Sequence, residues 1–205
     1  MPDAPPDDST PPDAVPDPTT PPGTTPPDDP APDGAIELRA DCDRCAGLCC
    51  VAPAFAASTD FAIDKPAGTP CPNLDDGFRC TIHAQLRPKG FAGCVAFDCH
   101  GAGQTVTQVT FGGRDWRRHP EVREQMFDVF AVMRHLHTFA VHLTEATTWP
   151  AAAPVHDELR QRLDEVVSLT RAGAEELAAL DLAPVGRAVD ELLTRASTLV
   201  RQLPA

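Results

Sequence analysis

Apolar residues recur at steps of three and four along the second half of the chain, which is the spacing of one face of an α-helix. The first such stripe covers residues 121–146, and Pro120 suits the first turn of a helix. We therefore predict a long amphipathic helix over 121–146. Its apolar positions are Val122, Met126, Val129, Met133, Leu136, Ala140 and Leu143.

Two further stripes alternate steps of four and three, which is typical of the seam between packed helices. They consist of Leu159, Leu163, Val166, Thr170, Gly173, Leu177 and Leu180, and of Val185, Val189, Leu192, Ala196, Leu199 and Leu203. The short break DLAP at 181–184 predicts an antiparallel helical hairpin over 155–203, with Gly173 opposite Leu192. With the preceding helix it forms a three-helix bundle. The sharper alternative is that these seams bind a protein partner or form a homodimer.

The segment GAGQTVTQVTFGG, residues 101–113, alternates threonine and valine between glycines, which predicts a short strand in an edge hairpin. It is no phosphate loop, because Val106 stands where the third glycine of G-x-G-x-x-G would fall. Nucleotide and S-adenosylmethionine binding have no support in the sequence, and neither a nucleophile elbow nor a metalloprotease helix is present. The sequence favours a non-catalytic protein.

Residues 1–34 hold 13 of the 23 prolines and eight aspartates, with no lysine or arginine. We predict a disordered tail, because the segment has too few apolar side chains to offset the entropy of ordering. The remaining residues are also mildly acidic, which argues against a nucleic-acid partner. Neither a signal peptide nor a membrane-spanning stretch is apparent, so we expect no membrane association and a cytoplasmic location.

Eight cysteines lie between residues 42 and 99. Disulfides would not persist in a reducing cytoplasm, so a dense cluster of thiols favours metal or iron–sulfur ligation. The thiolate is the natural soft ligand for both. Disulfide bonding and unperturbed structural thiols are the weaker alternatives.

Four of the cysteines stand in DCDRCAGLCC, residues 41–50. If this segment is helical or forms a helical turn, Cys42, Cys45 and Cys49 share one stripe while Cys50 points about 100° away. Alternatively, the CxxC pair forms a tight loop with Gly47 at positive φ. Adjacent cysteines are poor ligands for one small ion, so Cys50 serves another metal, closes the site from outside or packs as a small hydrophobe.

The other four cysteines follow as two spaced pairs, in PCPNLDDGFRC and GCVAFDC. Pro70 and Pro72 fix the backbone on both sides of Cys71. The residues Asp75, Asp76 and Gly77 predict a turn that brings Cys80 back toward it. Cys94 and Cys99 complete the set.

The succession CDRCAGLCC, PCPNL and GFRCTIHAQLRP, followed by two more cysteines, resembles the YkgJ-like zinc- or iron-chelating domain over about residues 41–99. Some members of that family are flagellin lysine methylases associated with an iron–sulfur cluster. The segment is also similar to the cysteine-rich leader of some actinobacterial pentapeptide-repeat proteins, although the repeats are missing here. The resemblance implies a 4Fe–4S cluster or zinc, with a preference for iron–sulfur. It implies the ligands Cys42, Cys45, Cys49, Cys50, Cys71, Cys80, Cys94 and Cys99.

Histidines and basic residues near the cysteines have secondary roles in this interpretation. His83 and His100 are alternative ligands, although each fits better as a neighbour of the site or a surface residue. The cations Arg79, Arg87 and Lys89 could offset thiolate charge. The histidines of the long helix are interpreted as ordinary surface or core-edge residues: His135, His137 and His142.

The sequence thus predicts a mainly α protein with three parts. A disordered tail covers residues 1–34, a small irregular cysteine-rich metal-binding module covers 35–118, and a helical region covers 119–205. The predicted function is non-catalytic or accessory metal binding. The alternative is an iron–sulfur redox or modification component that acts with a separate catalytic partner.

Overall fold

The computed structural model of the chain describes residues 36–202. The predicted tail over residues 1–34 lies outside this range. Between residues 36 and 202 the chain is helical, with two isolated β-bridges and no strand, which confirms the mainly α class. None of the helices in this range is both long and apolar enough to cross a bilayer.

The cysteine-rich region contains only short helical elements joined by turns. These are η1 Cys42–Arg44, α1 Leu48–Val51, η2 His83–Gln85, α2 Ala92–Ala96, α3 Ala102–Gln104 and η3 Thr105–Thr110. The helical region that follows contains η4 Pro120–Val122, α4 Arg123–Ala146, η5 Pro150–Val155, α5 His156–Leu169, α6 Ala174–Ala178 and α7 Leu182–Arg201.

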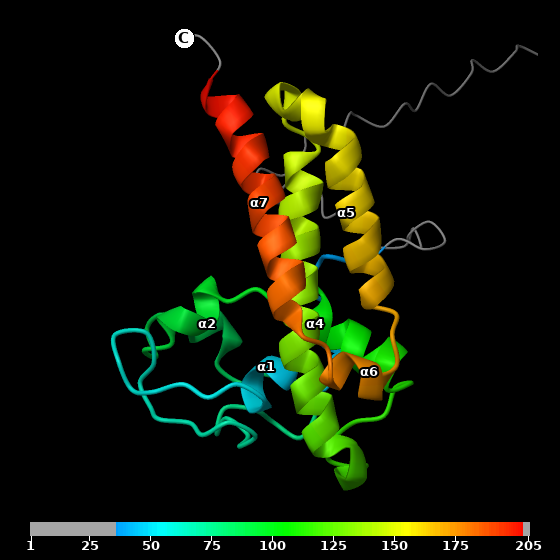
Figure 1. Ribbon diagram of the computed structural model, residues 1–205. Coiled ribbons are helices and arrows are strands. Elements are labelled where there is room, and N and C mark those ends of the chain that lie inside the picture. The colour runs from blue at the N-terminus through cyan, green and yellow to red at the C-terminus, as the bar shows by residue number, and fades with distance from the viewer. Residues whose placement is uncertain (1–35, 203–205) are drawn as a thin grey trace, which may run out of the picture. The chain divides into compact units, whose positions relative to one another are not determined.

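Helix α4 is the element on which the others pack (Figure 1). All seven apolar positions predicted for it are buried, and the helix begins after a 3₁₀ turn opened by Pro120. Helices α3, α5, α6 and α7 all contact α4, and so does the short helix α1. As a result Leu48 and Val51 of α1 belong to the same hydrophobic core as the residues of the bundle.

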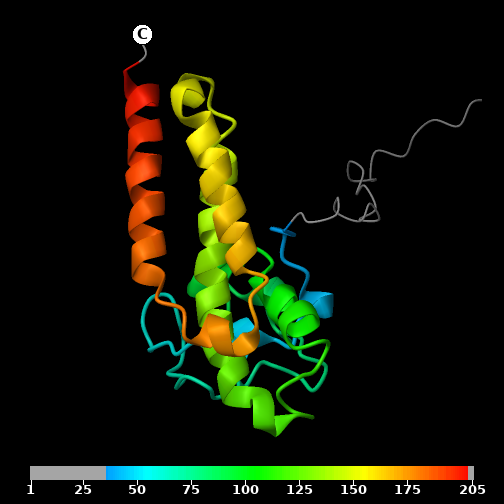
Figure 2. The same ribbon diagram turned by 45° about the vertical axis from the view of Figure 1, so that its right-hand side comes forward.

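The predicted hairpin is present with one interruption (Figure 2). Helix α5 ends at Leu169, and Gly173 is extended, with φ −66° and ψ 160°, so the first stripe is divided between α5 and α6. The expectation that Gly173 lies opposite Leu192 is wrong, because a Cβ at Gly173 would meet no heavy atom within 4 Å. Glycine is a poor helix former, and the break lets α6 pack separately on α4. Leu203 lies outside the described residues.

The strand predicted within residues 101–113 is also wrong. Residues 105–110 form a π-helix that continues α3. Helical spacing places Val106 in the core and directs the polar side chains of Gln104, Thr107 and Gln108 toward the first cysteine loop. Tertiary packing and these hydrogen bonds override the strand preference of threonine and valine, which reflects packing more than backbone preference.

Candidate functional site

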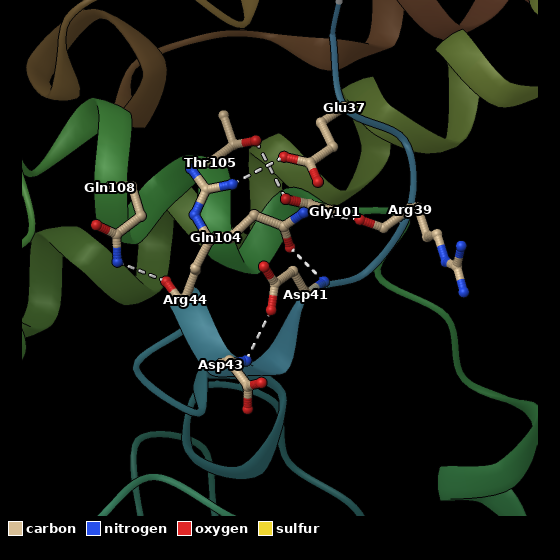
Figure 3. A network of polar contacts seen from close by, with 9 residues as sticks. All are labelled: Glu37, Arg39, Asp41, Asp43, Arg44, Gly101, Gln104, Thr105 and Gln108. Atoms are coloured by element: carbon tan, nitrogen blue, oxygen red, sulfur yellow. Dashed lines mark hydrogen bonds and ion pairs between the residues drawn. The ribbon is translucent and has the colours of Figure 1, made fainter. Parts of the chain in front are cut away.

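Polar side chains from α3 and η3 fix the backbone of the first cysteine loop (Figure 3). Gln104 is 2% exposed and bonds the chain on both sides of Ala40. Its Oε1 accepts from the Asp41 amide at 2.9 Å, and its Nε2 donates to the Arg39 carbonyl at 2.7 Å. The segment leading into Cys42 is therefore held from a position more than 60 residues away.

Three further hydrogen bonds hold the same loop beyond Cys42. The Ala46 amide donates to Thr107 Oγ1 at 3.1 Å, and the Ala46 carbonyl accepts from Trp116 Nε1 at 2.9 Å. Gln108 Nε2 donates to the Arg44 carbonyl at 2.7 Å. Since Ala46 and Trp116 are buried, the two bonds of Ala46 satisfy backbone groups that water does not reach.

The positive φ predicted for Gly47 by the loop alternative is confirmed; DCDRCAGLCC is not one continuous helix, although Cys42–Arg44 form a 3₁₀ turn. Gly47 adopts φ +64° and ends the loop, so α1 begins only at Leu48. A Cβ at Gly47 would also lie 2.9 Å from a side-chain carbon of Leu74. Cys49 and Cys50 are consecutive residues of α1, and their Sγ atoms are 4.0 Å apart.

The turn predicted at residues 75–77 is confirmed. The Asp75 amide donates to the Arg79 carbonyl at 2.9 Å, and Leu74 and Cys80 form an antiparallel bridge. This folded segment is attached to α1, because the Cys71 amide donates to the Cys50 carbonyl at 2.9 Å. Cys71 and Cys80 therefore lie on a hydrogen-bonded turn that is tied to the adjacent-cysteine pair.

The last two cysteines approach the site from different sides. Cys94 lies on α2, and Cys99 precedes α3, whose first amide at Ala102 bonds the Cys99 carbonyl at 2.9 Å. Gly103 separates Cys99 from the first loop. A Cβ at Gly103 would lie 2.6 Å from Cys45 Sγ and 4.0 Å from Cys99 Sγ. Both sulfurs therefore lie in the space that a side chain at position 103 would occupy or border.

All eight cysteines are free thiols, and burial keeps several of them protonated. Burial raises the pKa of Cys45 and of Cys94 to about 11. It also raises the pKa of Cys42 and of Cys80. A ligand that needs these thiolates must therefore displace protons.

The adjacent pair behaves differently. The hydrogen bond between the two thiols raises the pKa of Cys49 and lowers that of Cys50. The nearby ammonium of Lys65 lowers the pKa of Cys50 further, against the effect of burial. Of the two thiols, Cys50 therefore loses its proton more readily than Cys49.

Lys65 is a buried cation that the sequence analysis missed. Only 3% of it is exposed, and its Nζ lies 5.2 Å from the ring centroid of Phe55. The ammonium donates to four backbone carbonyls, at 3.1 Å to Val51, 2.5 Å to Pro53, 3.2 Å to Pro66 and 3.0 Å to Thr69. No local pattern distinguishes this lysine from an exposed loop residue, since all its acceptors are backbone oxygens brought together by the fold.

The charges that act on Lys65 come from thiols. Burial lowers its pKa, and the groups that raise it are, in order, Cys71, Cys50 and Cys49. An isolated buried ammonium is costly unless negative charge lies nearby. The groups whose negative charge would favour this ammonium are therefore cysteine side chains.

Of the three cations that the sequence analysis named, Arg79 is the one that acts on a cysteine. Its charge lowers the pKa of Cys42 against the effect of burial, and its Nη2 pairs with Asp43 at 2.5 Å. Its Nη1 is buried without a hydrogen-bond partner. Arg87 and Lys89 are exposed on the surface.

The histidines divide between surface and core. His83 is exposed, and His100 Nδ1 lies 3.6 Å from the carboxylate of Asp98. His135 and His142 lie on the exposed side of α4. His137 is 0% exposed; its Nδ1 lies 2.6 Å from the His100 carbonyl, and its Nε2 has no hydrogen-bond partner. Burial lowers the pKa of His137.

The donor set suits a soft metal, but the thiols are not preassembled around one. Within residues 36–202, no three cysteine, histidine or acidic side chains already stand close enough together to hold an ion. The chemistry of the side chains fits zinc or an iron–sulfur cluster, since both take cysteine thiolates. Binding would have to draw neighbouring sulfurs inward by movements of the loops that carry them.

Comparison with known proteins finds two similar sequences. Protein YybG of Bacillus subtilis (strain 168) is described as uncharacterized and is 48% identical over 165 residues, which are 80% of this chain and 59% of YybG. YeiW of Escherichia coli (strain K12), a UPF0153 protein, is 43% identical over 58 residues, 27% of this chain and 69% of YeiW. The chain belongs to the UPF0153 family.

Membership of UPF0153 assigns neither an activity nor a ligand, and the chain spans less than two thirds of YybG. No protein-family model matches the chain. No solved structure matches it either. The resemblance of this UPF0153 chain to the YkgJ-like family therefore stays a prediction.

Proposed function

We propose that the cysteine-rich region binds a metal centre, either an iron–sulfur cluster or zinc, through its thiolates. The protein would be a non-catalytic or accessory metal-binding protein of the cytoplasm, where thiols stay reduced. Thiols from four separate segments support this proposal, because α1, the 71–80 turn, α2 and the start of α3 all bring cysteines to the same part of the molecule.

The observation that carries the proposal is the buried ammonium of Lys65 beside Cys50 and Cys71. Carbonyl oxygens satisfy its hydrogen bonds but supply no full negative charge. A centre with four thiolates around Zn²⁺ is anionic, and so is a thiolate-bound iron–sulfur cluster. Either would provide the charge that balances Lys65.

The chemistry of the protein depends on which centre is bound. Zinc has no redox chemistry and would stabilise the loops, whereas an iron–sulfur cluster would supply one-electron transfer. The chain's own residues contribute ligands, a fixed loop backbone and a compensating cation. These roles fit an accessory protein without requiring a substrate pocket.

Anaerobic purification followed by elemental analysis and a visible spectrum tests the proposal. We expect either iron with inorganic sulfide and a coloured protein, or stoichiometric zinc and a colourless one. Reversible reduction of a cluster would favour the redox-component alternative. Protein that contains no metal after anaerobic handling, with its thiols paired as disulfides, would overturn the proposal.

A matched pair of lysine variants isolates the role of charge. Lys65→Met removes the buried cation and should lower metal content several-fold, whereas Lys89→Met removes an exposed one and should leave it unchanged. Far-ultraviolet circular dichroism shows whether the bundle remains folded in each variant. Equal metal content in two folded variants would contradict the role of Lys65.

A further inference from the structure

One histidine of α4 is buried with half of its hydrogen-bonding capacity unused. His137 is 0% exposed, and its Nε2 has no hydrogen-bond partner within residues 36–202. Burying a polar nitrogen without a partner costs free energy, and a leucine would fill a similar space without that cost. The polar role of this side chain therefore falls to the other ring nitrogen.

That nitrogen bonds the backbone beside a cysteine. His137 Nδ1 lies 2.6 Å from the carbonyl oxygen of His100, which stands 37 positions earlier in the chain. A carbonyl oxygen can only accept a hydrogen bond, so Nδ1 carries the proton and donates it. Because His100 follows Cys99 directly, the bond joins the core of the bundle to a candidate ligand.

The carbonyl belongs to a turn with an unusual backbone. His100 has φ +48° and Gly101 has φ +85°, so two consecutive residues are left-handed. This conformation is uncommon for a residue with a Cβ and persists where the surrounding structure holds it. The turn is also closely packed, since a Cβ at Gly101 would overlap the carbonyl oxygen of Glu37.

Local bonds and one distant bond hold this turn. Asp98 Oδ1 accepts from the His100 amide at 2.7 Å, and the Cys99 carbonyl accepts from the Ala102 amide at 2.9 Å. Both bonds form between close neighbours in sequence and fix the shape of the turn. The bond from His137 comes from α4 instead, so it fixes the position of the turn relative to the bundle.

The turn carries Cys99 to the first cysteine loop. A Cβ at Gly103 would lie 2.6 Å from Cys45 Sγ and 4.0 Å from Cys99 Sγ, so both sulfurs are neighbours of one backbone position. Cys45 is held on its own side, because the amide of the next residue, Ala46, donates to Thr107 Oγ1. The placement of one thiol beside the other therefore depends on how firmly the turn holds Cys99.

We infer that His137 is a positioning residue for Cys99. Its Nδ1–H holds the carbonyl of His100 and thereby keeps the left-handed turn that places the Cys99 thiol beside Cys45. The inference rests on the proposed function, because it treats Cys99 as a metal ligand, and it adds the residue that orients this ligand. Loss of a hydrogen-bonding partner around a ligand lowers metal affinity by roughly 10- to 100-fold in other metal sites.

Alkylation of the reduced, metal-free chain tests the positioning without any metal. His137→Leu removes the donor, whereas His137→Asn keeps an amide N–H close to the place of Nδ1. His142→Leu changes an exposed histidine of the same helix and is the matched control. We expect Cys99 to be alkylated several-fold faster in His137→Leu and at nearly the wild-type rate in the other two variants. The rate at Cys71 is the internal reference and should not change.

Titration of the same chains with Zn²⁺ against a competing chelator tests the link to metal binding. His137→Leu should bind zinc about tenfold more weakly than the wild type, and His137→Asn should recover most of the loss. Combining His137→Leu with Cys99→Ser should weaken binding no more than Cys99→Ser alone, because the histidine acts through that cysteine. Combining it with Cys94→Ser should give additive losses.

Circular dichroism shows whether each variant keeps its helices. If His137→Leu does not fold, His137→Gln replaces it, because the glutamine amide corresponds to Nε2 and leaves the His100 carbonyl without its donor. Equal alkylation of Cys99 with and without the donor would overturn the inference. So would additive zinc losses in the variant that lacks both His137 and Cys99, or a Cys99→Ser variant that binds zinc as the wild type does. A wild type that binds no metal would defeat the proposed function, and the alkylation rates would still decide whether His137 holds Cys99.

Discussion

The helical region and the cysteine-rich region are held together by different forces. Helix α4 is stabilised by a continuous row of buried apolar side chains, which also contacts α5, α6 and α7. The cysteine loops bury few large side chains and depend on individual hydrogen bonds, such as those of Gln104 and Trp116. This difference implies that the bundle folds on apolar burial, while the loops depend on polar contacts and would be the part that the proposed metal stabilises.

Removal of the metal should give the largest effect and should separate the two regions. Structural zinc contributes on the order of 10 kcal/mol to the folding of small metal-binding domains. Chelation of the loaded protein should therefore increase amide exchange strongly in the loops of residues 53–81 and leave α4 protected. Hydrogen exchange followed by mass spectrometry measures both regions at once. Equal protection of the loops with and without metal would show that they need no ligand.

Truncation of the bundle core should give the opposite pattern. Leu136→Ala truncates a fully buried side chain and leaves a cavity in its place. We therefore expect a loss of about 2–5 kcal/mol in the free energy of unfolding. Val200→Ala on the exposed side of α7 is the control and should change it by less than about 0.5 kcal/mol. Chemical denaturation provides both values. Similar values for the two variants would mean that the α4 row does not dominate stability.

Two glycine variants test the packing of the first cysteine loop on α3. Gly103→Ala places a Cβ 2.6 Å from Cys45 Sγ, and Cys45 cannot retreat easily because the neighbouring Ala46 is hydrogen-bonded on both sides. We expect the steric clash to lower the free energy of unfolding by about 1–3 kcal/mol. This loss exceeds the gain of about 1 kcal/mol from the higher helix propensity of alanine. Gly173→Ala meets open space at a negative φ and should be neutral or stabilising by up to about 1 kcal/mol. Thermal unfolding compares them, and an equal effect would refute the close contact at Gly103.

Acid should destabilise the contact between the two regions at His137, and we expect this effect to be the smallest of the four. Burial lowers the pKa of His137 below the ordinary value of 6.5, and its ring contacts the carbonyl of His100 next to Cys99. The unfolded chain therefore takes up this proton first, so the stabilisation is present above pH 6.5 and is lost as the pH falls through the folded pKa. Denaturation between pH 8 and about pH 5 should show a loss that His137→Gln reduces. A pH profile unchanged by that variant would exclude His137 as its source.

The parts that the sequence predicted are those with a periodic or strictly local cause. The stripe from Val122 to Leu143 predicted α4 because burial repeats with the helical turn. The turn around Gly77 was predicted because its residue types favour a reversal within four residues. Gly47 at positive φ was one of two stated alternatives, and the structure selected it.

The parts that the sequence missed depend on distant partners. Nothing near Lys65 in the sequence indicates that four carbonyls will surround its ammonium. Gln104 lies in a segment whose alternation predicted a strand, yet the same segment becomes a π-helix that holds the first cysteine loop. His137 was expected at the surface or at the edge of the core and is fully buried.

The sequence by itself determined the long helices that follow residue 119 and which residue types are available as ligands, because helical periodicity and thiol chemistry are local properties. It could not determine how the thiols are grouped. Only the tertiary structure decided that Cys99 approaches Cys45 across Gly103 and that the Cys71 amide donates a hydrogen bond to the Cys50 carbonyl. The residues of each pair are more than 20 positions apart in the sequence. Contacts between distant segments form when α4 gathers them into one core, and that packing is not written in any single stretch of sequence.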